Sequence, residues 1–156
     1  MKKNLLQKDD EKKFQLAVGH ELYASNFYKY CAGCLQKQGW FGSQKYFEKE
    51  SADELVHYYK LRDFLNDRGS EAEMPEVPEA EIKDETLAGI FSEAYTLELN
   101  LGTFYNDWYM STKDATVHAF LQDMVTIQRV SIGEYGDLIA RLERIGDALF
   151  DIEIGD

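Results

Sequence analysis

The clearest indication of the fold comes from the stretch YFEKESADELVHYYKLRDFLNDRG, residues 46–69. Its apolar residues recur every three or four positions, which predicts a long amphipathic helix that ends at Gly69. The buried stripe of this helix also contains Glu54 and His57, three residues apart. A glutamate and a histidine in this spacing project from one helix face. The pair is therefore either two ordinary polar residues on an exposed helix face or half of a metal site.

The same periodicity predicts helices on both sides of this stretch, four in all. The expected bounds are about residues 10–36, 43–68, 85–111 and 115–145. Ser43 is the candidate N-cap of the second helix. The polar stretch between the second and third helices holds both prolines and is the longest connection. Short, long and short links predict an all-α four-helix bundle, in which one long crossover joins two antiparallel hairpins.

Length and charge narrow the function classes. A chain of 156 residues suits one domain, spanning residues 1–156. The net charge of −12 disfavours nucleic acid as a partner, because phosphate binding needs clustered lysine and arginine. No stretch approaches the ~18 consecutive apolar residues of a membrane span. The first residues lack the apolar core of a secretory signal, so a cytoplasmic location is expected.

Each expected core stripe carries a polar residue near its middle: Glu21, Glu54 with His57, Glu98 and Gln128. A carboxylate in a dry bundle core is costly unless it is paired or bound to metal. Counting outward from the two short turns places these residues within about one helical turn of each other along the bundle. Carboxylate and imidazole ligands suit iron, manganese or zinc. A metal centre is predicted, with a purely structural polar network as the alternative.

The remaining cysteines and histidines are expected to lie outside this centre. His20 points about 100° away from Glu21 around the helix, and His118 lies near the start of the fourth helix. Cys31 and Cys34 share one helix face, and in a reducing compartment they are expected to be buried small apolar residues and not a disulfide.

The motifs together resemble those of the ferritins. HELYASNFYKY resembles the family's first-helix motif, and ESADELVHYYKLRDFLNDRG resembles its second-helix signature. LEL and IQ stand where the family places iron ligands on the third and fourth helices. The resemblance extends nearly from end to end and implies the ferritin-like bundle fold.

Position by position, the resemblance implies a di-iron centre. Glu21 and His57 would hold one iron, and Glu54 would bridge to the second. Glu98 would bind the second iron, and Gln128 would lie beside the oxygen pocket.

Residues at other positions of the motifs indicate which branch of the family the sequence resembles. Tyr28, two turns after the first-helix glutamate, matches a tyrosine that the resemblance implies is an electron donor. Leu55 stands where bacterioferritins carry a haem-binding methionine, so no haem is expected. Of the positions that match the family's third iron site, only Asp53 could bind a metal, so this site is expected to be missing or much weakened. Ten residues follow Gly146, and the family's short fifth helix is expected to be absent.

The resemblance implies an iron-storage ferritin with ferroxidase activity. Fe(II) would be oxidised with O₂ or H₂O₂ and stored as Fe(III) mineral in a homo-oligomeric shell of 24 subunits. Two alternatives stay open: another di-iron or manganese oxidase, and a non-catalytic or differently assembled bundle that serves as an interaction scaffold.

Overall fold

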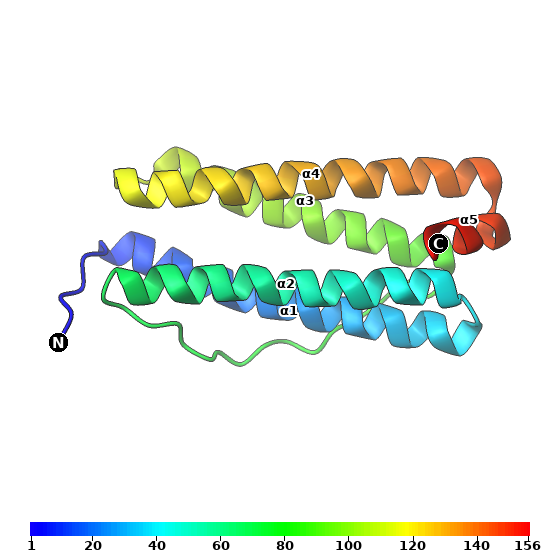
Figure 1. The fold of residues 1–156 in the computed structure, drawn as a ribbon, viewed down its shortest axis with the longest axis horizontal. Coiled ribbons are helices and arrows are strands. Elements are labelled where there is room, and N and C mark those ends of the chain that lie inside the picture. The colour runs from blue at the N-terminus through cyan, green and yellow to red at the C-terminus, as the bar shows by residue number, and fades with distance from the viewer. The chain divides into compact units, whose positions relative to one another are not determined.

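The structure is a computed structural model that describes residues 1–156, and all of its regular structure is helical. Figure 1 shows the five helices, α1 (Lys8–Gln38), α2 (Phe41–Asp67), α3 (Leu87–Ser111), α4 (Ala115–Ile145) and α5 (Asp147–Ile154). The expected all-α class and the first four helices are confirmed, with each boundary within two residues of its expected place. None of the helices combines the length and the apolar character that a membrane span requires.

The chain forms two compact units. The first comprises Met1–Tyr30 and Glu48–Glu81, and the second comprises Cys31–Phe47 and Ile82–Asp156. The first unit therefore holds most of α1 and α2, and the second holds α3, α4, α5 and the segment in which the chain turns from α1 into α2.

In the first unit, the bodies of α1 and α2 run antiparallel, and the long crossover passes along them (Figure 1). Phe14 and Phe64 stack across the two helices with ring centroids 4.9 Å apart. Gln15 on α1 holds the crossover by donating to the Glu71 carbonyl at 2.7 Å. Gly69 ends α2 as expected, with φ +84°, a conformation that glycine adopts without a steric penalty.

The start of α2 differs from the expectation that Ser43 is its N-cap. The helix begins at Phe41, so Ser43 lies inside the first turn. The side chain of Ser43 is buried and its hydroxyl has no hydrogen-bond partner. Its backbone N–H instead donates to the carboxylate of Asp151 at 2.7 Å, and that of Gly42 donates to the same carboxylate at 3.3 Å. The cap is supplied by a residue distant in sequence, which is why local sequence did not indicate it.

In the second unit, α3 and α4 pair as an antiparallel hairpin (Figure 1). Both helices have side-chain caps at their first turn. Thr86 accepts from the Gly89 N–H at 3.0 Å, and Asp114 accepts from the Thr116 N–H at 2.9 Å. These caps satisfy backbone donors that have no partner within the helix.

The expectation that a fifth helix is absent is wrong. Gly146, with φ +82°, ends α4, and α5 follows directly. A helix of eight residues is not stable by itself in water, so contacts with the rest of the chain must hold it. Phe150 is fully buried and lies edge-on to Phe91 of α3, with centroids 5.1 Å apart. Asp151 adds the bonds to the start of α2.

Candidate metal centre

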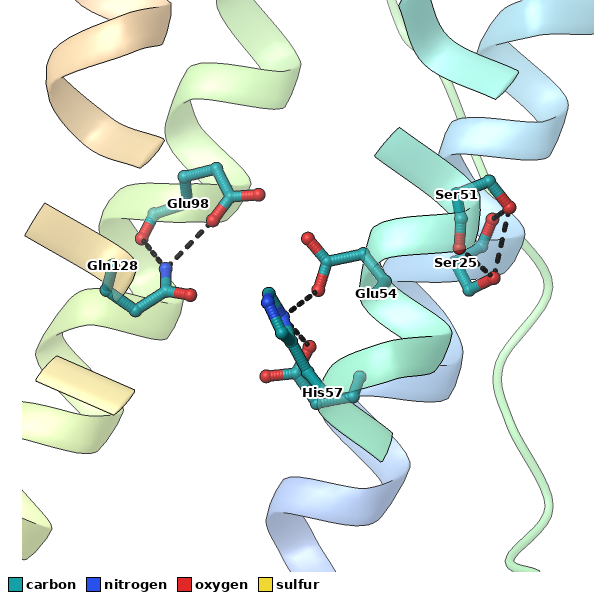
Figure 2. A network of polar contacts seen from close by, with 7 residues as sticks. Ser25, Ser51, Glu54, His57, Glu98 and Gln128 are labelled. Carbon is teal, nitrogen blue, oxygen red and sulfur yellow. Dashed lines mark hydrogen bonds and ion pairs between the residues drawn. The ribbon is translucent and has the colours of Figure 1, made fainter. Parts of the chain in front are cut away.

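Three potential metal ligands meet in the first unit. Glu21 comes from α1, and Glu54 and His57 come from successive turns of α2. One ligand atom from each residue lies within 4.8 Å of the other two. The side chains of Glu21 and Glu54 are 0% and 5% exposed, and that of His57 is 14% exposed. We refer to these three residues as the triad; two of them are labelled in Figure 2.

The imidazole of His57 faces both carboxylates of the triad. Its Nδ1 lies 3.1 Å from Glu54 Oε2 and 3.4 Å from Glu21 Oε2. Two carboxylates removed from water at such short range repel each other and lose hydration, which costs several kcal/mol per ion. A divalent cation between them would offset both effects. Two carboxylates and one imidazole nitrogen form a donor set that suits iron, manganese or zinc.

A second polar pair joins α3 and α4 in the other unit. Gln128 Nε2 donates to Glu98 Oε2 at 2.8 Å and to the Glu98 carbonyl at 3.3 Å (Figure 2). Glu98 is 0% and Gln128 1% exposed. The amide nitrogen of Gln128 is hydrogen-bonded to Glu98, whereas its amide oxygen is buried with no hydrogen-bond partner. A buried acceptor of this kind is rare and fits a site that receives a cation or a water molecule.

The structure thus gathers the five predicted ligands into two groups. The triad lies in the first compact unit, and the pair of Glu98 and Gln128 lies in the second. Their union into one di-iron centre stays a prediction. Tyr28 is fully buried on α1, two turns after Glu21, and lies edge-on to Phe27 at 5.6 Å. Its role as an electron donor also stays a prediction.

The other two histidines lie outside the triad, as expected. His118 stacks on Tyr109 with ring centroids 3.9 Å apart. His20 lines an open groove on the outer face of α1, together with Pro75 and Pro78 of the crossover. Partial burial lowers the pKa of His20, and the negative charge of Glu21 offsets part of this effect.

The two cysteines are free thiols. Cys31 is buried as expected, whereas Cys34 is only half-buried, which differs from the expectation. Burial raises the pKa of Cys31, and the neighbouring Cys34 and Glu93 raise it further. Cys31 therefore has the expected character of a buried small residue with little thiolate.

Two buried polar residues near the triad were not recognised as functional from the sequence. Ser25 lies one turn after Glu21 on α1, and Ser51 lies three residues before Glu54 on α2. They are 1% and 4% exposed and bond to each other across the helix pair. Their spacing from the two glutamates places them on the same inner stripes, and that spacing was the available signal.

Comparisons with a family model and with known sequences all point to the same family. The family model described as "Ferritin-like domain" matches residues 11–145. A bacterial non-heme ferritin from Staphylococcus aureus is 26% identical, with 99% of this chain and 95% of the relative covered. A bacterial non-heme ferritin from Staphylococcus haemolyticus is also 26% identical, with 92% of this chain and 88% of the relative covered.

Solved structures agree on the fold. A humanised archaeal ferritin superposes with a TM-score of 0.90 at 21% identity, covering 96% of both chains. An open-pore ferritin from Archaeoglobus fulgidus superposes with a TM-score of 0.91 at 21% identity, covering 98% of both chains. At this identity the likeness shows the fold alone, and that fold is the four-helix bundle expected from the sequence.

Proposed function

Because this chain belongs to the ferritin family, we propose that it is a ferroxidase that oxidises Fe(II) and stores the product as Fe(III) mineral. The observation that carries this proposal is the buried triad, whose three ligand atoms lie within 4.8 Å of one another. The two buried carboxylates share one imidazole, and burying their net negative charge is costly unless a cation offsets it.

We assign the ligands by family position, and Fe(II) is written as the substrate. Glu21 and His57 hold one Fe(II), and Glu54 bridges it to a second Fe(II). Glu98 binds the second ion, and Gln128 lies beside the place where the oxidant enters. The proposed centre thus unites the triad with the pair of Glu98 and Gln128.

The electron count defines the reaction. Two Fe(II) ions each give up one electron, and O₂ takes both electrons and two protons to become H₂O₂. With H₂O₂ as the oxidant, two electrons and two protons give two molecules of water. The three buried carboxylates favour Fe(III) over Fe(II), because the higher charge interacts more strongly with fixed negative charge at low dielectric. When only one of the two Fe(II) ions is bound, Tyr28 is the proposed source of the second electron. Its phenol gives one electron and one proton to O₂, the single Fe(II) gives the other electron, and solvent supplies the second proton.

Storage requires a place for the product. We propose a homo-oligomeric shell, by family membership a 24-subunit assembly, in a cytoplasmic setting. The net charge of −12 supports this role, because a strongly negative protein raises the local concentration of cations. Haem is not part of the proposal.

The test is aerobic Fe(II) oxidation, followed by the absorbance of the ferric product and by oxygen consumption. Wild-type protein is compared with a variant that combines Glu54→Ala and His57→Ala. The matched control combines Glu48→Ala and His118→Ala, which removes the same two residue types outside the triad. We expect the first variant to oxidise Fe(II) no faster than buffer, and the control to match the wild type.

One result would decide against this function, and another would decide against the assigned site. Wild-type protein that oxidises Fe(II) no faster than buffer is not a ferroxidase, and a non-catalytic bundle would then be the better description. Equal oxidation by the wild type and the Glu54 and His57 variant would place the chemistry elsewhere in the chain. Light scattering on the same samples measures the assembly, and a monomer or dimer that still oxidises iron would separate oxidation from storage.

A further inference from the structure

Two buried serines join α1 to α2 beside the triad (Figure 2). Ser51 Oγ donates to the Ser25 carbonyl at 2.9 Å, and Ser25 Oγ donates to the Ser51 carbonyl at 3.0 Å. The two hydroxyl oxygens are 3.1 Å apart. Lys29 Nζ also donates to Ser25 Oγ, at 3.3 Å. The contact is therefore reciprocal, with each helix both donating and accepting.

This contact constrains the helices more tightly than apolar packing does. A serine hydroxyl is one bond beyond Cβ, so it reaches the opposite main chain only where the two helices approach closely. A hydrogen bond weakens when its distance or angle changes by a small amount. Apolar side chains tolerate small displacements along the helix axis at less cost, because dispersion contacts are individually weak and non-directional. The serine pair therefore fixes the position of α1 relative to α2 along the helix axis.

The axial position of the helices determines the geometry of the triad. Glu21 precedes Ser25 by four residues, and Glu54 follows Ser51 by three. Because the helices are antiparallel, both ligands lie on the same side of the serine contact, at about 6 Å and 4.5 Å along the axis. The separation of 3.4 Å between Glu21 Oε2 and His57 Nδ1 is measured across this helix pair. A small slip of α1 against α2 would change it directly.

We propose that Ser25 and Ser51 are positioning residues. They hold Glu21 at the axial position in which it can bind a metal together with Glu54 and His57. The inference rests on the proposed function, because it requires that the triad binds a divalent metal. The serines touch neither the metal nor the oxidant, and they act through the helices that carry the ligands.

Substitution by alanine removes the two hydrogen bonds one at a time or together. Each hydroxyl donates to a backbone carbonyl, so Ser25→Ala and Ser51→Ala each keep one bond across the helices. The double variant keeps none, and it leaves no buried hydroxyl without a partner. Alanine has a higher helix propensity than serine, so in all three variants the change in propensity favours the folded helix.

The test is a titration with Co(II), whose visible absorption reports the number and geometry of its ligands. We expect the double variant to bind Co(II) at least about tenfold more weakly than the wild type, as when the support of a metal ligand is removed. We also expect its absorption spectrum at saturating Co(II) to differ from that of the wild type. Each single variant should lose about threefold in affinity, because one bond remains.

Ser43→Ala is the matched control. Ser43 is a buried serine of the same helix, α2, but its hydroxyl makes no hydrogen bond. This variant should keep the wild-type affinity and spectrum. A merely structural role would lower the thermal unfolding temperature of the double variant and leave the spectrum at saturation unchanged. If the double variant does not fold, a changed spectrum in either single variant supports the proposal, and an unchanged spectrum in both overturns it.

The outcomes separate this inference from the function on which it rests. A double variant with wild-type affinity and spectrum overturns the positioning role alone. Wild-type protein that binds Co(II) through the triad but does not oxidise Fe(II) overturns the ferroxidase function and leaves the positioning role in place. Co(II) binding that is equal in the wild type and in the Glu54→Ala, His57→Ala variant overturns both.

Discussion

The side-chain amide of Gln128 on α4 is hydrogen-bonded to the carboxylate of Glu98 on α3, with Nε2 and Oε2 2.8 Å apart. Both residues are buried, and the same nitrogen also reaches the Glu98 carbonyl at 3.3 Å. The amide therefore stabilises a buried acidic side chain while its own oxygen stays available. One residue thus serves the fold of the α3 and α4 hairpin and, in the proposed function, the metal centre.

Gln128→Ala should destabilise the metal-free protein. Removing the amide takes a donor from the Glu98 carboxylate, and a buried acceptor that loses its partner costs about 1–3 kcal/mol. Urea unfolding of the metal-free protein measures this difference. Gln122→Ala is the control on the same helix, because Gln122 is exposed and should change the stability by no more than about 0.5 kcal/mol. Equal unfolding midpoints for the two variants would contradict the structural role of the Gln128 bond.

Tyr28→Phe should slow iron oxidation without weakening metal binding. The ring of Tyr28 is fully buried, and phenylalanine keeps its packing against Phe27. Only the phenol group is lost, and that group is the proposed electron source. Stopped-flow oxidation of Fe(II) measures the rate, and Co(II) titration measures the affinity. A rate equal to that of the wild type would remove Tyr28 from the reaction.

The two cysteines should differ in reactivity. Burial raises the pKa of Cys31, so in the folded protein this thiol stays protonated at a pH where an exposed cysteine, with a pKa of about 8.5, is half thiolate. Thiolate is the reactive form, so raising the pH to about 8.5 should not make Cys31 react with iodoacetamide. Cys34 is half-buried and should react first. Mass spectrometry identifies the modified residue, and the Cys34→Ser variant should take up no label until it is unfolded. Labelling of native Cys31 at the rate of Cys34 would be inconsistent with its burial.

Gly42→Ala should displace α5. A Cβ at Gly42 would overlap the backbone carbonyl oxygen of Asp151, which is main chain and cannot rotate away. Gly33→Ala, inside α1, is the control, because a Cβ there meets no atom within 4 Å and alanine favours the helix by about 0.5–1 kcal/mol. We expect Gly42→Ala to lower the thermal unfolding temperature and Gly33→Ala to raise it. Limited proteolysis should cut residues 147–154 earlier in the Gly42 variant. Unchanged cleavage of that segment would mean that α5 is held without the close contact at Gly42.

Local sequence was sufficient for the long helices and for part of the site. The apolar period of three to four residues predicted α1 to α4, and glycines with positive φ at positions 69 and 146 mark two of the ends. Glu54 and His57 were predictable as a pair because a spacing of three on one helix fixes their common face. The approach of Glu21 to His57 and of Gln128 to Glu98 required the helices to pair, which the short turns indicated.

The serine contact and the fifth helix depended on tertiary structure. Serine is common on exposed helix faces, so Ser25 and Ser51 acquire meaning only when their hydroxyls meet the opposite main chain.

The four long helices, their order and the residue types of the candidate metal site followed from the sequence, because these depend on periodicities within one helix. The formation of α5 and the starting residue of α2 followed only from tertiary contacts. Both depend on Phe150 and Asp151 meeting residues 59 and 108 positions away, Phe91 and Ser43. A segment of eight residues is too short to be helical alone, so it gains its structure from the surface on which it packs.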